Sequence, residues 1–163
     1  MGISRYGRRG GRRVSDLAGL LRRLEDAKEE LLSSLDGLGP EEFGWQRDSR
    51  SIRRAVEETV DRFNLYFSRY LARALGLPPP PCIVPAQLGS AREAAIAVQI
   101  AHRRLGNLLH DLGPEDLSRT VTIEGEGTVG LAALLERAVE QYRRCRDEVL
   151  TLRRAREEAS GSP

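Results

Sequence analysis

The side chains best suited to chemistry in this sequence are one histidine, one threonine, one tyrosine and one cysteine on the apolar stripes of predicted helices. His102 follows the apolar spacing of the segment 91–112. Helical phasing directs it towards Thr59 of an earlier helix and towards Tyr142 and Cys145 of the last one. An imidazole donates, accepts or removes a proton, and a phenol donates a hydrogen bond. The pattern indicates a polar cluster between helices.

Two interpretations of this cluster are open. In the first, the cluster lines a small-molecule pocket, where His102 serves as donor, acceptor or base, Tyr142 donates a hydrogen bond and Tyr66 or Tyr70 lies at the mouth. In the second, His102 is a core histidine whose ring nitrogen is satisfied by a neighbouring hydroxyl, as most buried polar groups are. Cys145 behaves in either case as a small buried hydrophobe whose thiol has a raised pKa.

The histidines of this chain do not predict a metal site. His102 and His110 are the only two, and eight helical residues place them roughly 80° apart around the axis and about 12 Å apart along it. A site that combines both with Cys145 is therefore not expected. The sequence also has no glycine-rich phosphate loop, no Cys-x-x-Cys and no His-Glu-x-x-His motif. We expect neither a metal nor another cofactor.

Four long segments with helical spacing must position these side chains. Apolar residues recur at steps of three and four within 17–38, 52–74, 91–112 and 131–152. A cap precedes each segment: Ser15, Ser51, Ser90 in a capping box with Glu93, and Thr128. The alternating stretch Arg-Thr-Val-Thr-Ile-Glu-Gly-Glu-Gly before the last segment predicts a short extended loop. The fold class expected is all-α.

The linker between the second and third helices bears on the topology. Residues 77–90, Leu-Pro-Pro-Pro-Pro-Cys-Ile-Val-Pro-Ala-Gln-Leu-Gly-Ser, span about 43 Å if extended like polyproline, whereas the second helix spans about 38 Å. The linker is long enough to run the length of a bundle, so these two helices can lie parallel. We predict a four-helix bundle in up-down-down-up order, with a long proline-rich crossover between helices 2 and 3.

Charge and composition bound the function. Residues 1–13 hold five arginines and no acid, which leaves the rest of the chain at −3. Such a body is a poor nucleic-acid surface, so nucleic acid is not expected as a partner beyond this tail. We predict a disordered tail at 1–13, one domain at 14–157 and a disordered tail at 158–163. Two cysteines and the lack of a signal-peptide or membrane-spanning segment favour a cytoplasmic location.

Short motifs around the helix junctions resemble a known family. Leu-Gly-Pro-Glu-Glu-Phe at 38–43 is echoed by Leu-Gly-Pro-Glu-Asp-Leu at 112–117, which indicates a duplicated helical pair. With Ser-Ile-Arg-Arg-Ala-Val-Glu-Glu-Thr-Val at 51–60 and Gly-Thr-Val-Gly-Leu-Ala-Ala-Leu-Leu-Glu at 127–136, the chain resembles the DinB-like superfamily. That superfamily includes the helical domain of mycothiol-dependent maleylpyruvate isomerase. The resemblance covers roughly residues 14–155 and implies a homodimer.

The resemblance also implies a metal site that this chain lacks. In the family, zinc or nickel is typically held by one histidine of the second helix and a His-x-x-x-His pair of the fourth. Here the best match on the second helix is Thr59, and the fourth offers Ala138 with Tyr142 or Val139 with Arg143. We therefore expect a helical bundle without the family's metal that binds a small molecule or acts as a scaffold. The alternative is a metal-independent, thiol-dependent transferase-like enzyme that uses a pocket at His102 and Tyr142.

Overall fold

The computed structural model describes residues 16–78, 80–81 and 83–161, so the predicted tail 1–13 and the proline-flanked Cys82 lie outside the described residues. The described chain is mostly helical, which confirms the predicted helical class, with one small two-stranded sheet in addition. In chain order the elements are α1 (Leu17–Ser34), α2 (Pro40–Gly44), α3 (Ile52–Asp61), η1 (Arg62–Phe67), α4 (Ser68–Ala74), α5 (Ala91–Leu109), η2 (Pro114–Ser118), β1 (Thr120–Ile123), β2 (Gly127–Gly130) and α6 (Leu131–Gly161).

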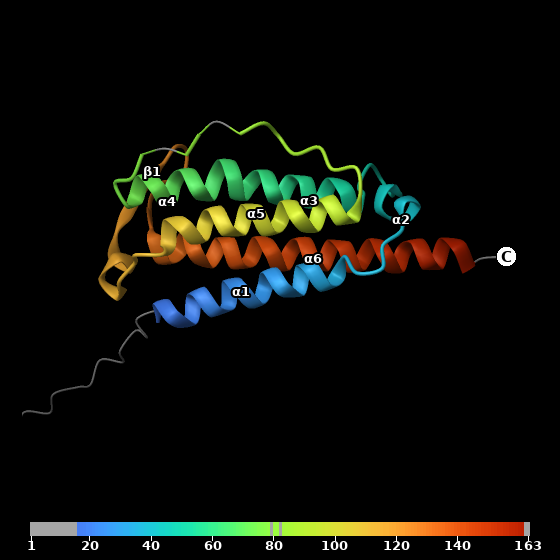
Figure 1. Ribbon diagram of the computed structural model, residues 1–163, viewed down its shortest axis with the longest axis horizontal. Coiled ribbons are helices and arrows are strands. Elements are labelled where there is room, and N and C mark those ends of the chain that lie inside the picture. Colours follow the sequence, from blue (N-terminus) through green and yellow to red (C-terminus); the bar gives the residue numbers. More distant parts are fainter. Residues whose placement is uncertain (1–15, 79, 82, 162–163) are drawn as a thin grey trace, which may run out of the picture.

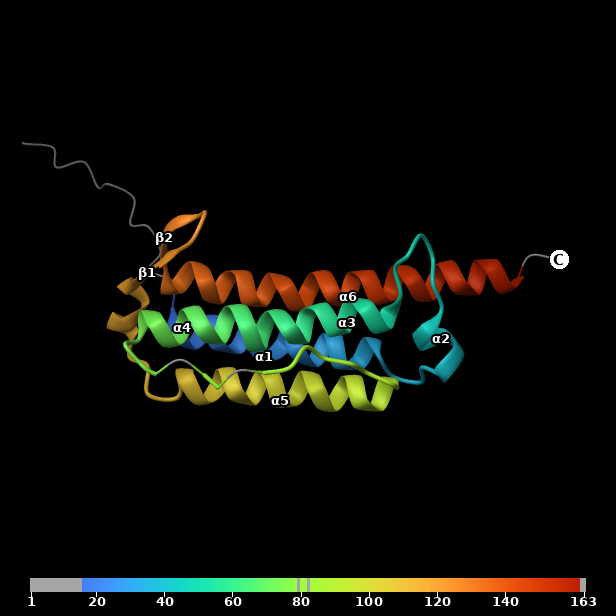
Figure 2. The same ribbon diagram turned by 90° about the horizontal axis from the view of Figure 1, so that it is seen from above.

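The long helices lie side by side along the molecule, as both ribbon views show (Figures 1 and 2). α1 and α6 run in one direction, and the rod formed by α3, η1 and α4 runs in the other. α5 begins at the far end from the end of α4 and runs in the same direction as that rod (Figure 1). The linker 77–90 therefore returns along the length of the molecule, as its proline-rich composition and reach predict.

Two acidic side chains of α3 hold the linker in place. The Asp61 carboxylate accepts a hydrogen bond from the backbone N–H of Ala86 at 2.7 Å, and the Glu57 carboxylate accepts one from Leu88 at 2.8 Å. Backbone N–H groups in an extended segment have no helical partner, so carboxylates from a neighbouring helix can satisfy them. These contacts fix the linker against α3.

Two of the four helix caps predicted from the sequence, Ser51 and Ser90, are present in the structure. Ser51 accepts from Arg54 N–H at 3.1 Å, and Ser90 accepts from Glu93 N–H at 3.2 Å. The Glu93 carboxylate reaches one residue further back than a capping box requires and accepts from Gly89 N–H. The first helix is capped by Asp16, which accepts from Ala18 N–H, and not by the predicted Ser15, which lies outside the described residues.

The stretch before the last helix is extended as predicted, but it forms a β-hairpin and not a loop, and the predicted Thr128 cap is wrong. β1 and β2 pair antiparallel, with Val121 opposite Val129 and Thr122 opposite Thr128. The chain reverses at Gly125, whose φ of +80° is one that residues with a Cβ rarely adopt. Thr128 is thus a strand residue, and α6 begins only at Leu131. α6 then continues to Gly161, past residue 157 where the predicted domain ends.

The second predicted helix contains a π-helical segment at its centre. η1 follows α3 without a break, and the Ser68 hydroxyl donates to the Phe63 carbonyl at 2.8 Å. Phe63, Asn64 and Phe67 are the buried residues of this segment. π-helical turns are rare and are frequent at functional sites.

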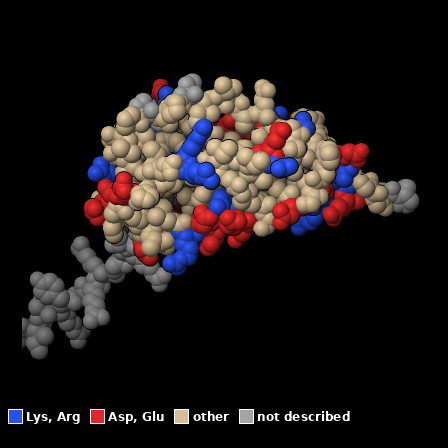
Figure 3. Space-filling view, viewed as in Figure 1, with Lys and Arg blue, Asp and Glu red and all other residues tan. Residues whose placement is uncertain are grey.

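The surface of the described residues carries both positively and negatively charged side chains. On the face in Figure 3, basic and acidic side chains are interspersed, and no basic stripe of the kind that binds nucleic acid runs across it. No helix in the described part of the chain combines the length and the apolar character that a membrane span requires.

Candidate functional site

The structure divides the residues of the predicted cluster between two places. His102 and Tyr142 meet where α5, α1 and α6 pack together. Thr59, Cys145 and Tyr66 instead line a groove between the rod α3–η1–α4 and α6. His102 and Tyr142 are not among the residues that line this groove. The five side chains therefore do not form one pocket.

His102 bridges two partners through its two ring nitrogens. Its Nε2 lies 2.7 Å from a Glu25 carboxylate oxygen, and its Nδ1 lies 3.1 Å from the Tyr142 hydroxyl. Because a carboxylate only accepts, the neutral ring donates from Nε2 to Glu25 and accepts the Tyr142 O–H at Nδ1. Burial lowers the pKa of His102 below its usual value, although the bond to Glu25 raises it in part. The imidazole is therefore held neutral.

Tyr142 is a core residue whose phenol is kept protonated. Its side chain is almost fully buried, and its ring stacks on Phe63 with centroids 4.1 Å apart. Burial raises the pKa of Tyr142 far above its usual value. A neutral phenol that donates to His102 holds the imidazole in place, which is what the core-histidine interpretation describes.

Glu25 completes this network and was not anticipated from the sequence. It accepts from Lys28 at 2.5 Å as well as from His102, and the Lys28 bond followed by the His102 bond lowers the pKa of its carboxyl. The available signal was its spacing, since Glu25 follows the buried Leu24 at the edge of the α1 stripe. Edge residues of an amphipathic helix reach a neighbouring helix only when the crossing geometry allows it, and the sequence does not give that geometry.

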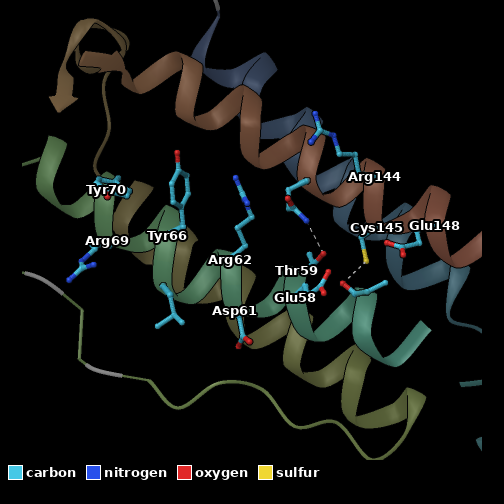
Figure 4. Close-up of a pocket in the computed structure, with 13 residues that line it drawn as sticks. Glu58, Thr59, Asp61, Arg62, Tyr66, Arg69, Tyr70, Arg144, Cys145 and Glu148 are labelled. Carbon is cyan, nitrogen blue, oxygen red and sulfur yellow. Dashed lines mark hydrogen bonds between the residues drawn. The ribbon is translucent and has the colours of Figure 1, made fainter. Parts of the chain in front are cut away.

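The groove between the rod and α6 has a volume of about 680 Å³ and is the candidate functional site (Figure 4). That volume lies within the range of small-molecule sites, roughly 300–1,000 Å³. Its lining combines charged, aromatic and uncharged polar side chains: Ala55, Glu58, Thr59, Asp61, Arg62, Leu65, Tyr66, Arg69, Tyr70, Gln141, Arg144, Cys145 and Glu148. Only four of these, Thr59, Tyr66, Tyr70 and Cys145, were considered as pocket residues from the sequence.

At the base of the groove, Thr59 of α3 faces two residues one turn apart on α6. The Gln141 amide donates to Thr59 Oγ1 at 3.0 Å, and the Cys145 thiol donates to the Ala55 carbonyl at 3.5 Å (Figure 4). The residues on α6 that face Thr59 are thus Gln141 and Cys145. The resemblance to the family had instead offered Ala138 with Tyr142 or Val139 with Arg143 as the positions opposite Thr59. Those registers pointed to Ala138, Val139 and Tyr142, which are buried core residues, and to Arg143.

The acidic side chains of the groove are already engaged. Glu58 pairs with Arg50 at 2.9 Å and with Arg54 at 3.1 Å, and Glu148 pairs with Arg50 at 2.6 Å. The bond to Arg50, more than the one to Arg54, lowers the pKa of Glu58. Asp61 points away from α6 towards the linker, where it accepts a hydrogen bond from the Ala86 N–H (Figure 4). These carboxylates therefore neutralise little of the charge of the groove's arginines.

The arginines of the groove are less committed. Arg62 lies over the Tyr66 ring at 5.0 Å from its centroid, and Arg144 has its nearest carboxylate, Glu140, at 3.6 Å on the exposed face of α6. Neither Arg62 nor Arg69 has a carboxylate within 4.0 Å in the described part of the chain. A guanidinium presents several N–H donors in a plane and suits a carboxylate, phosphate or sulfonate.

Tyr66 connects the groove to the hairpin. Its hydroxyl accepts from Arg137 at 2.9 Å and donates to Glu126 of the hairpin turn at 3.3 Å. Tyr66 was predicted to lie at the mouth of a pocket that contains His102, whereas the groove that it lines does not contain His102. A smaller hollow of about 260 Å³ continues beyond it and shares Arg62, Gln141 and Arg144.

No cluster of three or more histidine, cysteine, aspartate or glutamate side chains suited to a metal ion occurs within residues 16–78, 80–81 and 83–161. Comparison of the chain with protein-family models, with curated proteins and with solved structures finds no match.

Cys145 offers a direct test of the chemistry at the base of the groove. Burial raises the pKa of its thiol to about 12, so only about one molecule in ten thousand carries the thiolate at pH 8. We expect iodoacetamide to leave Cys145 unmodified in the folded Cys82→Ser variant and to modify it fully in guanidinium chloride, as read by intact mass. Rapid alkylation of the folded variant would contradict this assignment and would restore the thiol as a candidate nucleophile.

Proposed function

We propose that this chain is a DinB-like four-helix bundle, connected in up-down-down-up order, that lacks the family's metal site and binds a small organic anion in the groove between α3–η1–α4 and α6. The observation that carries the proposal is the charge state of the groove. Its carboxylates are paired with arginines outside it or bound to backbone, whereas in the described part of the chain Arg62 has no carboxylate within 4.0 Å and Arg144 has only the exposed intrahelical partner Glu140, at 3.6 Å.

The position of the polar groups favours an anion over a cation. An incoming cation would have to displace the bonds that Arg50 makes to Glu58 and Glu148. An anion meets guanidinium groups that only an aromatic face or an exposed intrahelical pair engages, and exposed pairs contribute little, about 0–1 kcal/mol. Binding of an anion therefore costs fewer existing interactions.

The apolar part of the groove favours a ligand with an organic body. Leu65 is 42% exposed and lines the groove with an apolar side chain. The rings of Tyr66 and Tyr70 meet edge to face at 5.0 Å. Such surfaces stabilise a bound aromatic or aliphatic group through removal of apolar area from water. An organic molecule with a carboxylate, phosphate or sulfonate group on an apolar skeleton matches both the arginines and the apolar surface of the groove.

The test uses a pair of fluorescent probes that differ in charge. We expect 8-anilinonaphthalene-1-sulfonate to bind the full-length protein and to bind an Arg62→Gln, Arg144→Gln double variant about tenfold more weakly, the loss that about 1.4 kcal/mol produces. N-phenyl-1-naphthylamine, which has no sulfonate, will bind both proteins equally. Arg103→Gln is the control, since Arg103 is an exposed arginine of α5 that does not line the groove.

Two results would overturn the proposed anion site. One is an unchanged affinity of the anionic probe in the double variant. The other is an equal loss for the neutral probe in a double variant whose circular dichroism spectrum and thermal unfolding are unchanged, which would mean that the two arginines do not select for the negative charge.

The transferase-like alternative has less support. It requires His102 and Tyr142 at a ligand, whereas both ring nitrogens of His102 bind protein groups and Tyr142 is buried beneath Phe63. A scaffold role and the homodimer that the resemblance implies stay predictions. Sedimentation equilibrium measures the oligomeric state directly.

A further inference from the structure

The smaller hollow adjoins the anion groove beside the turn of the β-hairpin. Its volume is about 260 Å³, and Arg62, Gln141 and Arg144 line both the hollow and the groove. The residues that line the hollow alone are Phe67, Glu126, Arg137 and Glu140. Because three residues are common to the two spaces, a molecule bound in the groove can extend into the hollow.

The charges around the hollow are not balanced. Three arginines line it, Arg62, Arg137 and Arg144, against the two glutamates Glu126 and Glu140. Arg62 points from η1 towards α6 (Figure 4) and has no carboxylate within 4.0 Å in the part of the chain that the structure describes. An excess of guanidinium groups favours a bound anion.

Arg137 already holds one anion, which belongs to the chain itself. Its Nη1 donates to the Glu126 carboxylate at 2.5 Å and to the Tyr66 hydroxyl at 2.9 Å, and that hydroxyl donates to the same carboxylate at 3.3 Å. The bond to Arg137 lowers the pKa of Glu126, so this carboxylate is charged at neutral pH. A guanidinium and a phenol thus form a carboxylate site that a side chain of the hairpin turn fills.

Glu126 can leave this site without loss of the hairpin. It lies in the turn between the paired segments Thr120–Ile123 and Gly127–Gly130 and takes no part in the strand pairing. Both Glu126 and Arg137 are exposed, and exposed ion pairs contribute little to stability because water screens them. A ligand that is held in the groove by one end presents its other end at a high effective concentration, so a second anionic group can replace Glu126.

We propose that the ligand of the groove carries two anionic groups on an apolar skeleton, and that the second group binds Arg137 and Tyr66 in the hollow in place of Glu126. This inference rests on the proposed anion groove, which holds the first group. It assigns a ligand class, an organic dianion such as a dicarboxylate. It also assigns a role to the hairpin turn, whose Glu126 occupies the second position until the ligand binds. No covalent step is involved.

The test compares ligands that differ only in the second anionic group. Straight-chain dicarboxylates of four to eight carbons are each compared with the monocarboxylate of the same length, so that the spacing of the two carboxylates is varied as well. Affinity is measured on the full-length protein by displacement of 8-anilinonaphthalene-1-sulfonate at neutral pH and constant ionic strength. We expect at least one dicarboxylate to bind about tenfold more tightly than its monocarboxylate.

Two substitutions in the same ion pair will change this preference in opposite directions. Arg137→Gln removes the guanidinium, so the ratio of the two affinities will fall to about one. Glu126→Gln removes the competing carboxylate, so the ratio will rise about two- to fivefold, the gain that loss of an exposed ion pair allows. If the pair only tied the hairpin to α6, both substitutions would act alike.

Matched controls remove the same charges from other places. Glu124→Gln removes a carboxylate from the same hairpin turn, and Arg154→Gln removes an exposed guanidinium from α6. Neither Glu124 nor Arg154 lines the groove or the hollow, so both variants will keep the preference of the unmodified protein.

The results that overturn this inference differ from those that overturn the anion groove. Equal affinities for mono- and dicarboxylates at every length, or a preference that Arg137→Gln leaves intact, would refute the second position while the groove keeps its dependence on Arg62 and Arg144. If Arg137→Gln does not fold, an unchanged preference in Glu126→Gln is the refuting result. Probe binding that does not depend on Arg62 and Arg144 would refute the proposed groove, and this inference with it.

Discussion

Replacement of Tyr142 by alanine will lower the free energy of unfolding by about 3–5 kcal/mol, the usual cost of removing a buried aromatic ring. Tyr142 is 1% exposed, and its ring stacks against Phe63 at the centre of the helical packing. The substitution removes this contact, leaves a cavity and leaves His102 Nδ1 without its donor. Chemical denaturation at constant pH measures the change.

Two matched variants divide this effect into its parts. Tyr142→Phe keeps the ring and removes only the hydroxyl, so it will cost about 1–3 kcal/mol, the range for leaving a buried partner unsatisfied. Tyr70→Ala removes a half-buried tyrosine from the same region and will cost less than Tyr142→Ala. A loss in Tyr142→Ala no larger than that in Tyr70→Ala would show that Tyr142 is not the packing centre described here.

Acidification from pH 7.5 to 5.5 will destabilise the protein through His102. Burial lowers the pKa of His102 in the fold below the value near 6.5 that the unfolded chain retains. Between these two pKa values the unfolded state binds more protons, so the free energy of unfolding falls as the pH falls through this window. Each unit of difference between the two pKa values contributes about 1.4 kcal/mol.

The comparison that isolates His102 is the His102→Gln variant. Glutamine can still accept the Tyr142 O–H but does not titrate, so the decrease in Tm between pH 7.5 and 5.5 will be smaller than in the unmodified protein. Titration of Glu25 does not contribute to this difference, because its pKa is lowered from 4.5 and therefore lies below the range from pH 7.5 to 5.5. An identical pH dependence in both proteins would refute the lowered pKa of His102.

The hydroxyl of Tyr142 provides a second check on the same imidazole. In Tyr142→Phe no O–H donates to Nδ1, so the neutral ring loses the hydrogen bond that favours the unprotonated form. We expect the pKa of His102, followed by NMR of the ring protons, to rise relative to the unmodified protein. His110, the other histidine and an exposed one, is the internal reference in the same spectra.

Several features of this molecule follow from residues close together in the sequence. The caps Ser51 and Ser90 bind N–H groups three residues ahead, and the apolar spacing that defines each stripe depends only on the helical repeat. The helical class and the long reach of the linker were predictable for this reason. His102 and Tyr142 were also expected to face each other, since both follow the inward stripes of their helices, and they lie in contact.

The errors at the hairpin have a physical cause. In the first strand the buried Val121 and Ile123 alternate with exposed residues, which is a strand pattern only four residues long, and in the second strand Val129 is the buried residue. A segment of that length is stable only with a partner strand, and the pairing depends on the glycine turn at Gly125 and on packing against α4 and α6. Thr128 resembles a helix cap in sequence, but its place in the ladder opposite Thr122 prevents that role.

The sequence by itself determined the helices, the direction of their apolar faces and the absence of histidine from the second and last helices, because these depend on residue type and local spacing. Only the tertiary structure decided that Gln141 faces Thr59, that Glu25 reaches His102, and that residues 62–67 form a π-helical turn. These depend on the rotation and crossing of helices far apart in the chain. That geometry is set by the packing of all the side chains together.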